Sequence, residues 1–402
     1  MIRAIHNQHG GQLQNRGTAR PFRSTPTRLR HGAGTAAEFS PAASGTVVRT
    51  EYGPGMRLPI LTVAATLFLT SCESVRFYSQ AVRGQWEMIA KAQPVEKLLA
   101  AGPLDSKLRQ QLQKAMQIRE FAAAQLHLPV QGQYDVFVDL GRPHVSWVVM
   151  AAPEFSVEPK RWWYPVLGKL DYRGYFSEKD AQSLGNRLKE DGWDVAMGGV
   201  DAYSTLGIFR DPLLNTFLFE PDTDLAELLF HELAHQKVFL SGDTDFNEAF
   251  ATSVAQEGVQ RWLIAAGQHR ELAHYRQRLH EESLFVAEVL RTREELQALY
   301  ARQPDISSAD LHQEKAAVFS RLQLRIRSLP ELKHRKEYAN WVAKPLNNAR
   351  LNTISAYHQL VPAFHRLLAQ EQQSLPAYYA AVQRLERLTK KQRRAKLGLP
   401  PE

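Results

Sequence analysis

The sequence predicts an α+β fold, in which a small β-sheet is followed by a predominantly helical half. The first observation is a set of short segments between residues 134 and 206 that are rich in Val, Tyr, Phe and Trp, as β-strands are. The second is that the chain from Asp222 onward is mostly helix-favouring. Its long stretches at 272–303 and 311–328 repeat apolar residues with helical spacing.

The chain divides into three predicted segments. Residues 1–55 are rich in Gly, Arg and Thr without periodicity, as in a disordered or misassigned leader. Residues 56–72 have the pattern of a signal peptide, and residues 73–402 are the expected folded part. Within that part we expect an α/β region at 73–221 and a helical region at 222–402.

The positive charge of the chain is concentrated in the leader. Residues 1–55 contain seven arginines against two acidic residues, so they hold +5 of the formal net charge of +8. A nucleic-acid-binding protein is expected to carry its basic excess on the folded domain. We therefore predict no nucleic-acid partner.

The segment from Met56 to Cys72 resembles a bacterial lipoprotein signal. Arg57 precedes an apolar run at Leu58–Leu69, which is short for a membrane span but has the length of a signal-peptide core. The resemblance implies cleavage before Cys72, lipidation of its thiol and a periplasmic location. In the lipoprotein pattern, Asp directly after the cysteine is the usual signal for inner-membrane retention. This chain has Glu73 there, which favours the outer membrane. Met56 is the expected initiator. The alternative is a buried strand with an incidental cysteine.

The α/β region is expected to contain helices and strands in alternation. Helical periodicity at 73–126 is interrupted at Gly102-Pro103. Residues 134–150 predict two strands that form a hairpin around a Gly-Arg-Pro turn. The other expected elements are one helix and two short strands, at Glu178–Asp191, Asp194–Met197 and Val200–Leu206.

The segment His-Glu-Leu-Ala-His at 231–235 is the strongest functional signal. A helix is expected to begin near Thr223 or Asp224, which can cap it. A spacing of four places His231 and His235 on one face, where both ring nitrogens can share a tetrahedral ion. Glu232 projects about 100° away and can act as a general base on a water molecule.

A third ligand is expected on the next helix. The chain's only cysteine is Cys72, so a Cys-rich zinc site is excluded and any metal must be held by His and carboxylate groups. Ser241-Gly242-Asp243 indicates a turn, and Asp245 or Asn247 can start a second helix. Packed against the first helix, it would direct Glu248 toward the imidazoles and complete a site for one Zn²⁺ ion.

These motifs resemble those of known metallopeptidases. His-Glu-Leu-Ala-His followed by Asn-Glu-Ala-Phe-Ala is similar to the gluzincin pattern, which implies a zincin-like fold with zinc at His231, His235 and Glu248 and with Glu232 as base. The chain also resembles a bacterial family of predicted aminopeptidases that are periplasmic lipoproteins, over about residues 70–370. The segments that carry this second resemblance are FHELAHQ, FNEAFAT, YRGYF (Tyr172–Phe176), DAYSTLG (Asp201–Gly207), DPLLNT (Asp211–Thr216), NNARL (Asn347–Leu351) and VPAF (Val361–Phe364).

Two positions depart from the gluzincin pattern. Aminopeptidases of that type carry a Gly-x-Met-Glu-Asn segment whose Glu binds the substrate amine, and residues 196–200 lack such a Glu. Gluzincins often have an Asp four residues after the third ligand, where this chain has Thr252. Glu227, one turn before His231, is an alternative group to orient that imidazole. The other reading of Glu227 is a solvated helix residue.

Several further residues are candidates for substrate contacts. Tyr203, Tyr357 and His358 could stabilise the oxyanion, with Tyr357 preferred. The expected strand Val200–Leu206 could pair with an extended peptide. Asn347 and Asn348 are expected to cap a helix near Ala349 rather than bind substrate, and Asp201 and Glu220 are candidate amine anchors. The basic stretch Lys390–Lys396 is interpreted as a solvated helix end rather than a lipid-binding patch.

The predicted function is zinc-dependent peptide hydrolysis in the bacterial envelope, as an aminopeptidase. The predicted partners are a peptide substrate and a membrane that holds the lipidated Cys72. Two alternatives remain open: an endopeptidase or cell-wall peptide amidase, and a non-enzymatic lipoprotein that uses metal to fix two helices. The sequence does not indicate an oligomeric state.

Overall fold

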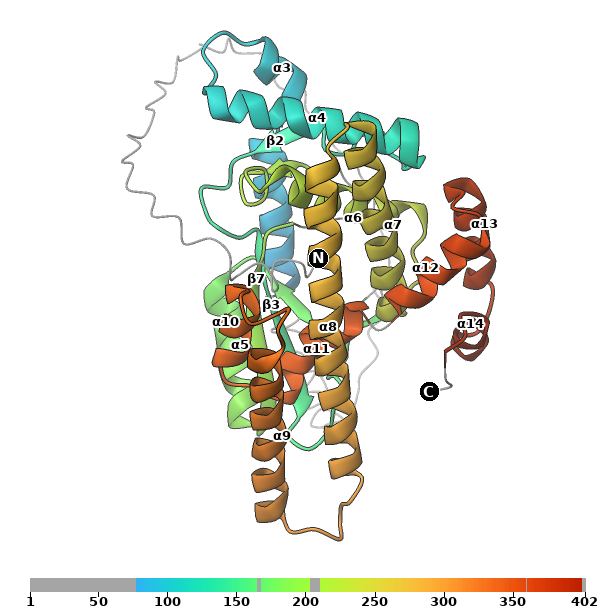
Figure 1. Ribbon diagram of the computed structural model, residues 1–402. Helices are drawn as coiled ribbons and strands as arrows, with labels where there is room; N and C mark the ends of the chain where they lie inside the picture. The colour runs from blue at the N-terminus through green and yellow to red at the C-terminus, as the bar shows by residue number, and fades with distance from the viewer. Residues whose placement is uncertain (1–76, 165–167, 203–209, 359, 400–402) are drawn as a thin grey trace, which may run out of the picture. The chain divides into compact units, whose positions relative to one another are not determined.

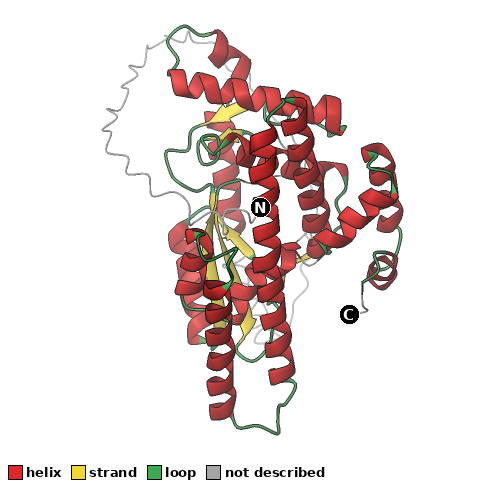
Figure 2. Ribbon diagram, viewed as in Figure 1, coloured by secondary structure: helices red, strands yellow, loops and turns green. Residues whose placement is uncertain are grey.

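The computed structural model describes residues 77–164, 168–202, 210–358 and 360–399, with the side chains of 355–358 excepted. From Ser79 onward these residues belong to one compact unit. The predicted leader, the signal peptide and Cys72 lie outside the described residues and remain predictions. Figures 1 and 2 show a mostly helical chain with short strands, so the α+β prediction is confirmed.

Helices make up most of the described chain. Residues 77–91 are helical, and the named helices are α3 (Val95–Ala100), α4 (Ser106–Leu126), α5 (Glu178–Glu190), α6 (Asp222–Lys237), α7 (Thr244–Ala265), α8 (His269–Tyr300), α9 (Ser308–Ser328), α10 (Lys336–Ala343), α11 (Asn348–His358), α12 (Val361–Gln370), α13 (Leu375–Glu386) and α14 (Lys390–Lys396). Within the described residues, no helix is both long and apolar enough to cross a membrane.

Among the described residues, the strands form three small sheets rather than one. Their bounds are β1 (Gln93–Pro94), β2 (Val136–Val138), β3 (Ser146–Pro153), β4 (Trp162–Tyr164), β5 (Gly168–Leu170), β6 (Arg173–Tyr175), β7 (Trp193–Val200) and β8 (Leu213–Leu214). The strand orders are β1-β2-β8, β6-β3-β7 and β4-β5. In the first sheet β2 runs parallel to β8, and in the second β3 is antiparallel to both neighbours.

The predicted hairpin at 134–150 is wrong. Both strands exist, as β2 and β3, but they belong to different sheets. The reason lies in the turn, where the side chain of Asn215 accepts a hydrogen bond from Leu140 N at 2.8 Å and donates one to Arg142 O at 3.2 Å. These bonds tie the turn to the segment after β8, and β3 then pairs with β7 instead.

The strand predicted at Asp194–Met197 is wrong in its bounds, and the one predicted at Val200–Leu206 is absent at residues 201–202, while its residues 203–206 lie outside the described part of the chain. One continuous strand, β7, pairs with β3 along all eight of its residues. It passes through Gly199, whose missing side chain leaves room for His144: an added Cβ would lie 2.3 Å from that imidazole. The strand ends at Val200, and residues 203–209 lie outside the described part of the chain.

The helices predicted from periodicity are confirmed. The predicted helix at Glu178–Asp191 is α5, whose N-cap Ser177 accepts a hydrogen bond from Asp180 N. The long helices expected at 272–303 and 311–328 are α8 and α9, and the break at Gly102-Pro103 separates α3 from α4.

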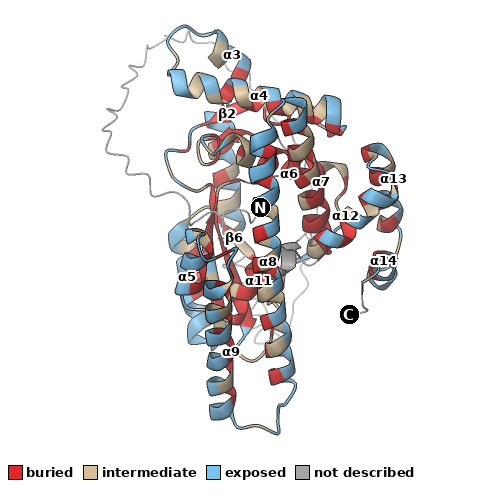
Figure 3. Cartoon of the chain, viewed as in Figure 1, coloured by how far each residue is buried: buried red, intermediate tan, exposed pale blue. Residues whose placement is uncertain are grey.

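The buried apolar residues form two main cores that share helix α8. The larger core gathers side chains of α4, α6, α7, α12 and α13, together with Leu272 and Tyr275 from the start of α8. The smaller core lies between the rest of α8 and helices α9, α10 and α11. Figure 3 shows the difference in burial, because α6 and α7 are mostly buried whereas α8 and α9 expose much of their surface.

The interpretation of Lys390–Lys396 as a solvated helix end is wrong for two of its residues. Arg393 and Arg394 are both only 8% exposed, while Lys391 and Lys396 are exposed. Arg393 forms an ion pair with Asp243, with Nη2 2.5 Å from Oδ2. This pair attaches α14 to the residue that precedes α7 (Thr244–Ala265).

Candidate functional site

Helix α6 carries the His-Glu-Leu-Ala-His segment through the larger core. Its buried residues run almost without interruption from Leu225 to His235, so the helix is enclosed on nearly all sides. The predicted cap by Thr223 or Asp224 is wrong: the N-cap is Pro221, which makes no side-chain cap bond. Asp224 instead pairs with Arg278 of α8, which fixes the first turn of α6 from outside.

Helix α7 follows after a short connection that is tied to its first turn. It begins at Thr244, close to the predicted start. The Asn247 side chain bonds both backbone groups of Leu240, each at 2.8 Å, and so fixes the connection against the helix. The next residue is Glu248, which is 7% exposed. The predicted second helix with an inward carboxylate is thus present.

The two helices bring His231, His235 and Glu248 together. The Nε2 atoms of the two histidines are 3.1 Å apart, and Glu248 Oε2 lies 3.2 Å from His231 Nε2 and 3.7 Å from His235 Nε2. Zn–N and Zn–O bonds of about 2.1 Å in a tetrahedron separate neighbouring ligand atoms by about 3.4 Å. The three distances lie on either side of this value, so the cluster could hold a metal ion.

The electrostatics of the cluster also suit metal ligands. Burial lowers the pKa of His231 to about 4, although its contact with the Glu248 carboxylate raises it. Burial would raise the pKa of Glu248, but the two imidazoles hold it well below 4.5. A neutral imidazole and an ionised carboxylate are the protonation states in which these groups bind a cation. His231 is the most exposed of the three side chains, at 14%, so a ligand would approach past it.

Glu232 lies on the same helix and is buried, with 3% exposed. Tyr134, from the loop before β2, is near it: burial raises the pKa of this phenol well above 10, and the charges of Glu232 and Asp211 raise it further. The Tyr134 backbone has a left-handed φ of 56° and donates to Asp211 O at 2.7 Å. Sequence reasoning missed Tyr134, because nothing in its local pattern marks it as more than a turn residue.

Glu227, the sequence-based candidate for orienting the His231 imidazole, is held by helix α8, and its role toward His231 stays a prediction. Glu227 is buried, and its Oε2 lies 3.0 Å from Arg278 Nη2, so it is not a solvated residue and at least one oxygen is engaged by α8. His235 Nδ1 is buried and has no hydrogen-bond partner among the described residues. This agrees with the presence of Thr252 where gluzincins often have an orienting Asp.

Of the other predicted site residues, only some lie in the described part of the chain. Tyr203 and the side chains of Tyr357 and His358 lie outside the described residues, so their roles remain predictions. Asp201, a candidate amine anchor, has its Oδ1 2.5 Å from His144 Nδ1, and the pKa of His144 is raised mainly by this hydrogen bond. Glu220 is partly buried just before α6.

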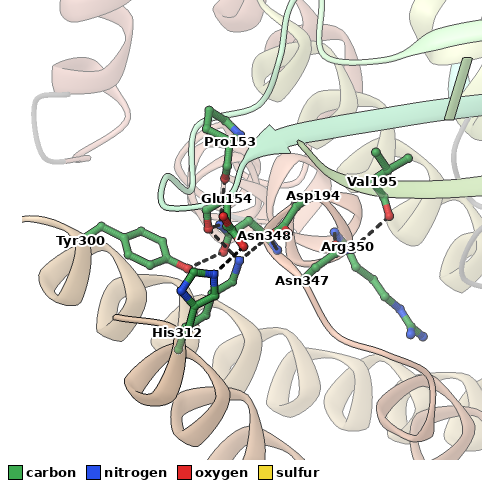
Figure 4. A network of polar contacts seen from close by, with 10 residues as sticks. Pro153, Glu154, Asp194, Val195, Tyr300, His312, Asn347, Asn348 and Arg350 are labelled. Atoms are coloured by element: carbon green, nitrogen blue, oxygen red, sulfur yellow. Dashed lines mark hydrogen bonds and ion pairs between the residues drawn. The ribbon is translucent and has the colours of Figure 1, made fainter. Parts of the chain in front are cut away.

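Asn347 caps α11 as predicted, whereas Asn348 is the first residue of that helix and its side chain bonds other elements instead of capping (Figure 4). Asn347 Oδ1 accepts from Arg350 N at 2.8 Å, at the start of α11. Asn348 Nδ2 donates to the carbonyls of Pro153 and Glu154, and its Oδ1 accepts from the Tyr300 hydroxyl at 2.9 Å. Since its donor and acceptor groups are engaged by protein, Asn348 joins α8, α11 and the end of β3.

Comparison with known proteins assigns the chain to a family. A family model described as "Putative aminopeptidase" matches residues 76–397, which is most of the sequence and includes α6, α7 and α14. Among curated proteins and solved structures, none gives a significant match. The match covers well over half of the chain, and the protein therefore belongs to the putative aminopeptidase family.

Proposed function

We propose that the protein is a zinc-dependent peptidase of zincin-like fold whose metal is held by His231, His235 and Glu248. The observation that carries the proposal is the convergence of three donor atoms from two packed helices, with His235 and Glu248 buried and His231 partly buried. Their chemistry, two imidazoles and one carboxylate, is that of catalytic zinc sites that keep one position open. Family membership independently indicates peptide hydrolysis.

The chain's own residues would do the proton chemistry. Bound zinc would supply a Lewis acid that polarises the scissile carbonyl and lowers the pKa of a water molecule. Glu232 projects about 100° from the adjacent ligand on α6, so it can reach that water without taking a ligand position. Its carboxylate would accept the proton of the attacking water and then donate it to the leaving amine. Burial of Glu232 keeps this proton away from bulk solvent.

Tyr134 is a further candidate for this reaction. Its phenol stays protonated because of burial and the nearby carboxylate charges, so it can donate a hydrogen bond. Tyr357 and Tyr203 remain the sequence-based candidates for oxyanion stabilisation. Replacing each of the three by Phe and comparing kcat at constant zinc content would identify the residue that contributes in the transition state.

The central test is the substitution Glu232→Gln. It should leave zinc binding intact, because Glu232 is not a ligand, and reduce peptide hydrolysis by at least about 100-fold. Glu257→Gln is the matched control, since Glu257 lies on α7, the second helix of the site, but pairs with Arg261 at 2.7 Å. Mass spectrometry measures the zinc content of each protein, and a peptide pool measures its cleavage activity. Full activity of the zinc-loaded Glu232→Gln protein would reject the mechanism.

The preference for free N-termini is a finer part of the proposal. The family description favours an aminopeptidase, whereas residues 196–200 lack the amine-binding Glu of related enzymes. Free and N-acetylated versions of the same peptides distinguish the two. Cleavage of free peptides alone supports the aminopeptidase, and equal cleavage of both supports an endopeptidase or amidase. Zinc binding without turnover on either set would favour the metal-stabilised scaffold.

We also propose an envelope location with a lipid anchor at Cys72. The support is sequence alone: an apolar run at Leu58–Leu69 followed by Leu-Thr-Ser-Cys. Mass spectrometry of the native protein should find residue 72 as the modified N-terminus. An unmodified chain that retains residues 1–55 would contradict both the anchor and the proposed initiator Met56.

A further inference from the structure

The helix at residues 77–91, drawn in blue in Figure 1, presents an apolar stripe to solvent. Val82, Trp86 and Ile89 are 57%, 65% and 47% exposed. Their spacing is i, i+4 and i+7, so the three side chains lie on one face of the helix. Single exposed apolar residues are common, but a contiguous stripe on one helix face indicates an interaction surface.

The opposite face of this helix is fixed to the protein. Gly84 lies so close to Phe176 that an added Cβ would be 2.3 Å from the ring. Gln80 Oε1 accepts from Phe176 N at 2.8 Å, and Met88 is 3% exposed within the larger core. These contacts hold the helix in one rotational setting. The apolar stripe is therefore presented outward and cannot be hidden by rolling the helix.

The position of the stripe in the chain indicates its occupant. Four residues, 73–76, separate Cys72 from the first described residue of the helix, and the five extended steps between residues 72 and 77 span at most about 18 Å. A chain anchored at Cys72, or by the apolar run before it, would thus hold this helix close to the bilayer. The residue types fit as well, because Trp has an amphipathic ring that favours the membrane interface. Exposed Arg83 adds a positive charge next to the stripe.

We propose that Val82, Trp86 and Ile89 insert into the headgroup region of a lipid bilayer, as a second membrane contact beside the anchor. The helix would lie in the plane of the interface with its fixed face toward the protein. The anchor retains the protein at the membrane, and the stripe sets how it faces the surface. The proposal rests on the proposed membrane anchor but not on peptidase activity, so its failure and that of the proposed peptidase function are distinguishable.

The test uses the full chain with Cys72→Ser, in which an introduced cysteine is the only one and the apolar run at Leu58–Leu69 still serves as the membrane anchor. An environment-sensitive fluorophore is attached at Val82→Cys or, as a matched control, at Lys91→Cys. Lys91 is exposed but lies nine residues further on, about 180° around the helix from Val82. The probe surface is a vesicle of phosphatidylethanolamine and phosphatidylglycerol that contains a lipid-borne spin-label quencher.

On vesicles, the fluorescence emission of the label at position 82 should shift to shorter wavelength and be quenched. The emission of the label at position 91 should change little. Adding Trp86→Gln should reduce the quenching at 82, because about a third of the stripe is removed. Equal behaviour at the two positions, or a chain that stays unbound, overturns the proposal. So does a label at 82 that is already shielded in buffer, whether by a second copy, seen as a dimer in ultracentrifugation, or by the chain's own upstream residues.

Discussion

Two pairs of neighbouring helices, α6–α7 and α8–α9, are built on opposite principles. In α6–α7 the helices are apolar on almost every side, and three of the polar side chains they carry, His231, His235 and Glu248, meet at one place. In α8–α9 an apolar seam faces inward, while the outer faces are charged and joined by ion pairs such as Arg325–Glu288 at 2.6 Å. Figure 3 shows this contrast in burial.

The difference shows what a buried ligand site requires. A helix that is enclosed on all sides cannot satisfy its polar groups with water, so partners must come from other elements. Arg278 from α8 supplies them at the start of α6, and Arg393 from α14 does so before α7. The α8–α9 pair needs fewer such supports, because most of its charged groups are exposed and ion pairs between exposed groups are individually weak. Its buried exceptions are Glu281, paired with Arg335, and Lys315, paired with Asp194.

The largest expected effect comes from removing one of these supports. Arg393→Met should lower the free energy of unfolding by about 3–5 kcal/mol, because it leaves the buried Asp243 carboxylate without its cation. Arg302→Met is the matched control in the helical hairpin. It breaks a 2.6 Å pair with Glu314, but both side chains are about half exposed, so the loss should be about 0–1 kcal/mol.

Urea unfolding of the two variants and the parent measures both changes. A double variant with Asp243→Asn should recover part of the Arg393→Met loss, since it removes the unpaired charge. Equal losses in the two single variants would show that burial does not separate the two kinds of ion pair.

The second effect is the response of the two helix pairs to zinc. A ligand that binds only the folded state at 100 times its Kd stabilises that state by about 2.7 kcal/mol. Amide hydrogen exchange should therefore slow in α6 and α7 when zinc is added, and change less in α9 and the second half of α8. Glu248→Ala should abolish the response by removing one of the proposed ligands. Uniform slowing throughout would mean that the two pairs open as one unit.

The smallest effect concerns pH and is confined to the hairpin. The pKa of His312, in the first turn of α9, is raised above 6.5 by hydrogen bonds with Ser308 O at 2.7 Å and Glu154 Oε1 at 2.9 Å. A pKa raised by folding adds stability that is fully present below 6.5 and is lost as pH rises through the folded value. Protection of the amides at the start of α9 against hydrogen exchange should accordingly fall over this range.

An NMR titration of the His312 ring gives the folded pKa directly. His312→Gln should remove the pH dependence of the protection factors in α9, which are exchange rates corrected for the intrinsic base-catalysed rate, and leave those in α6 and α7 unaffected. An unshifted titration, or a pH dependence that persists in the variant, would contradict this prediction.

The two helix pairs also differ in how they could be predicted. The hairpin helices α8 and α9 follow from apolar periodicity, because one face is solvated and the other is not. Helix α6 is buried all round and has no such contrast, so its prediction depended on the spacing of His231 and His235. Glu248 followed from the same metal chemistry, and the capping role of Asn347 from its place before α11.

The remaining features depend on contacts between distant parts of the chain. The separation of β2 from β3 is decided by Asn215, more than seventy residues beyond the turn that it holds. The burial of Arg393 depends on Asp243, and the place of Tyr134 on its bond with Asp211. The local sequence does not indicate which distant residues will become partners. It therefore predicts a solvated basic helix end at Lys390–Lys396 and a simple hairpin at 134–150.

Helix α8 has 32 residues and so a length of about 48 Å. It extends from the larger core to the turn at 301–307, at the end of the hairpin away from α6 and α7 (Figure 1). That turn is almost wholly exposed, so a guest domain could be inserted there with little cost to packing. The tip of the hairpin is therefore a suitable place for a reporter or affinity tag. A tag placed there would lie far from the proposed zinc site and would report on the intact protein.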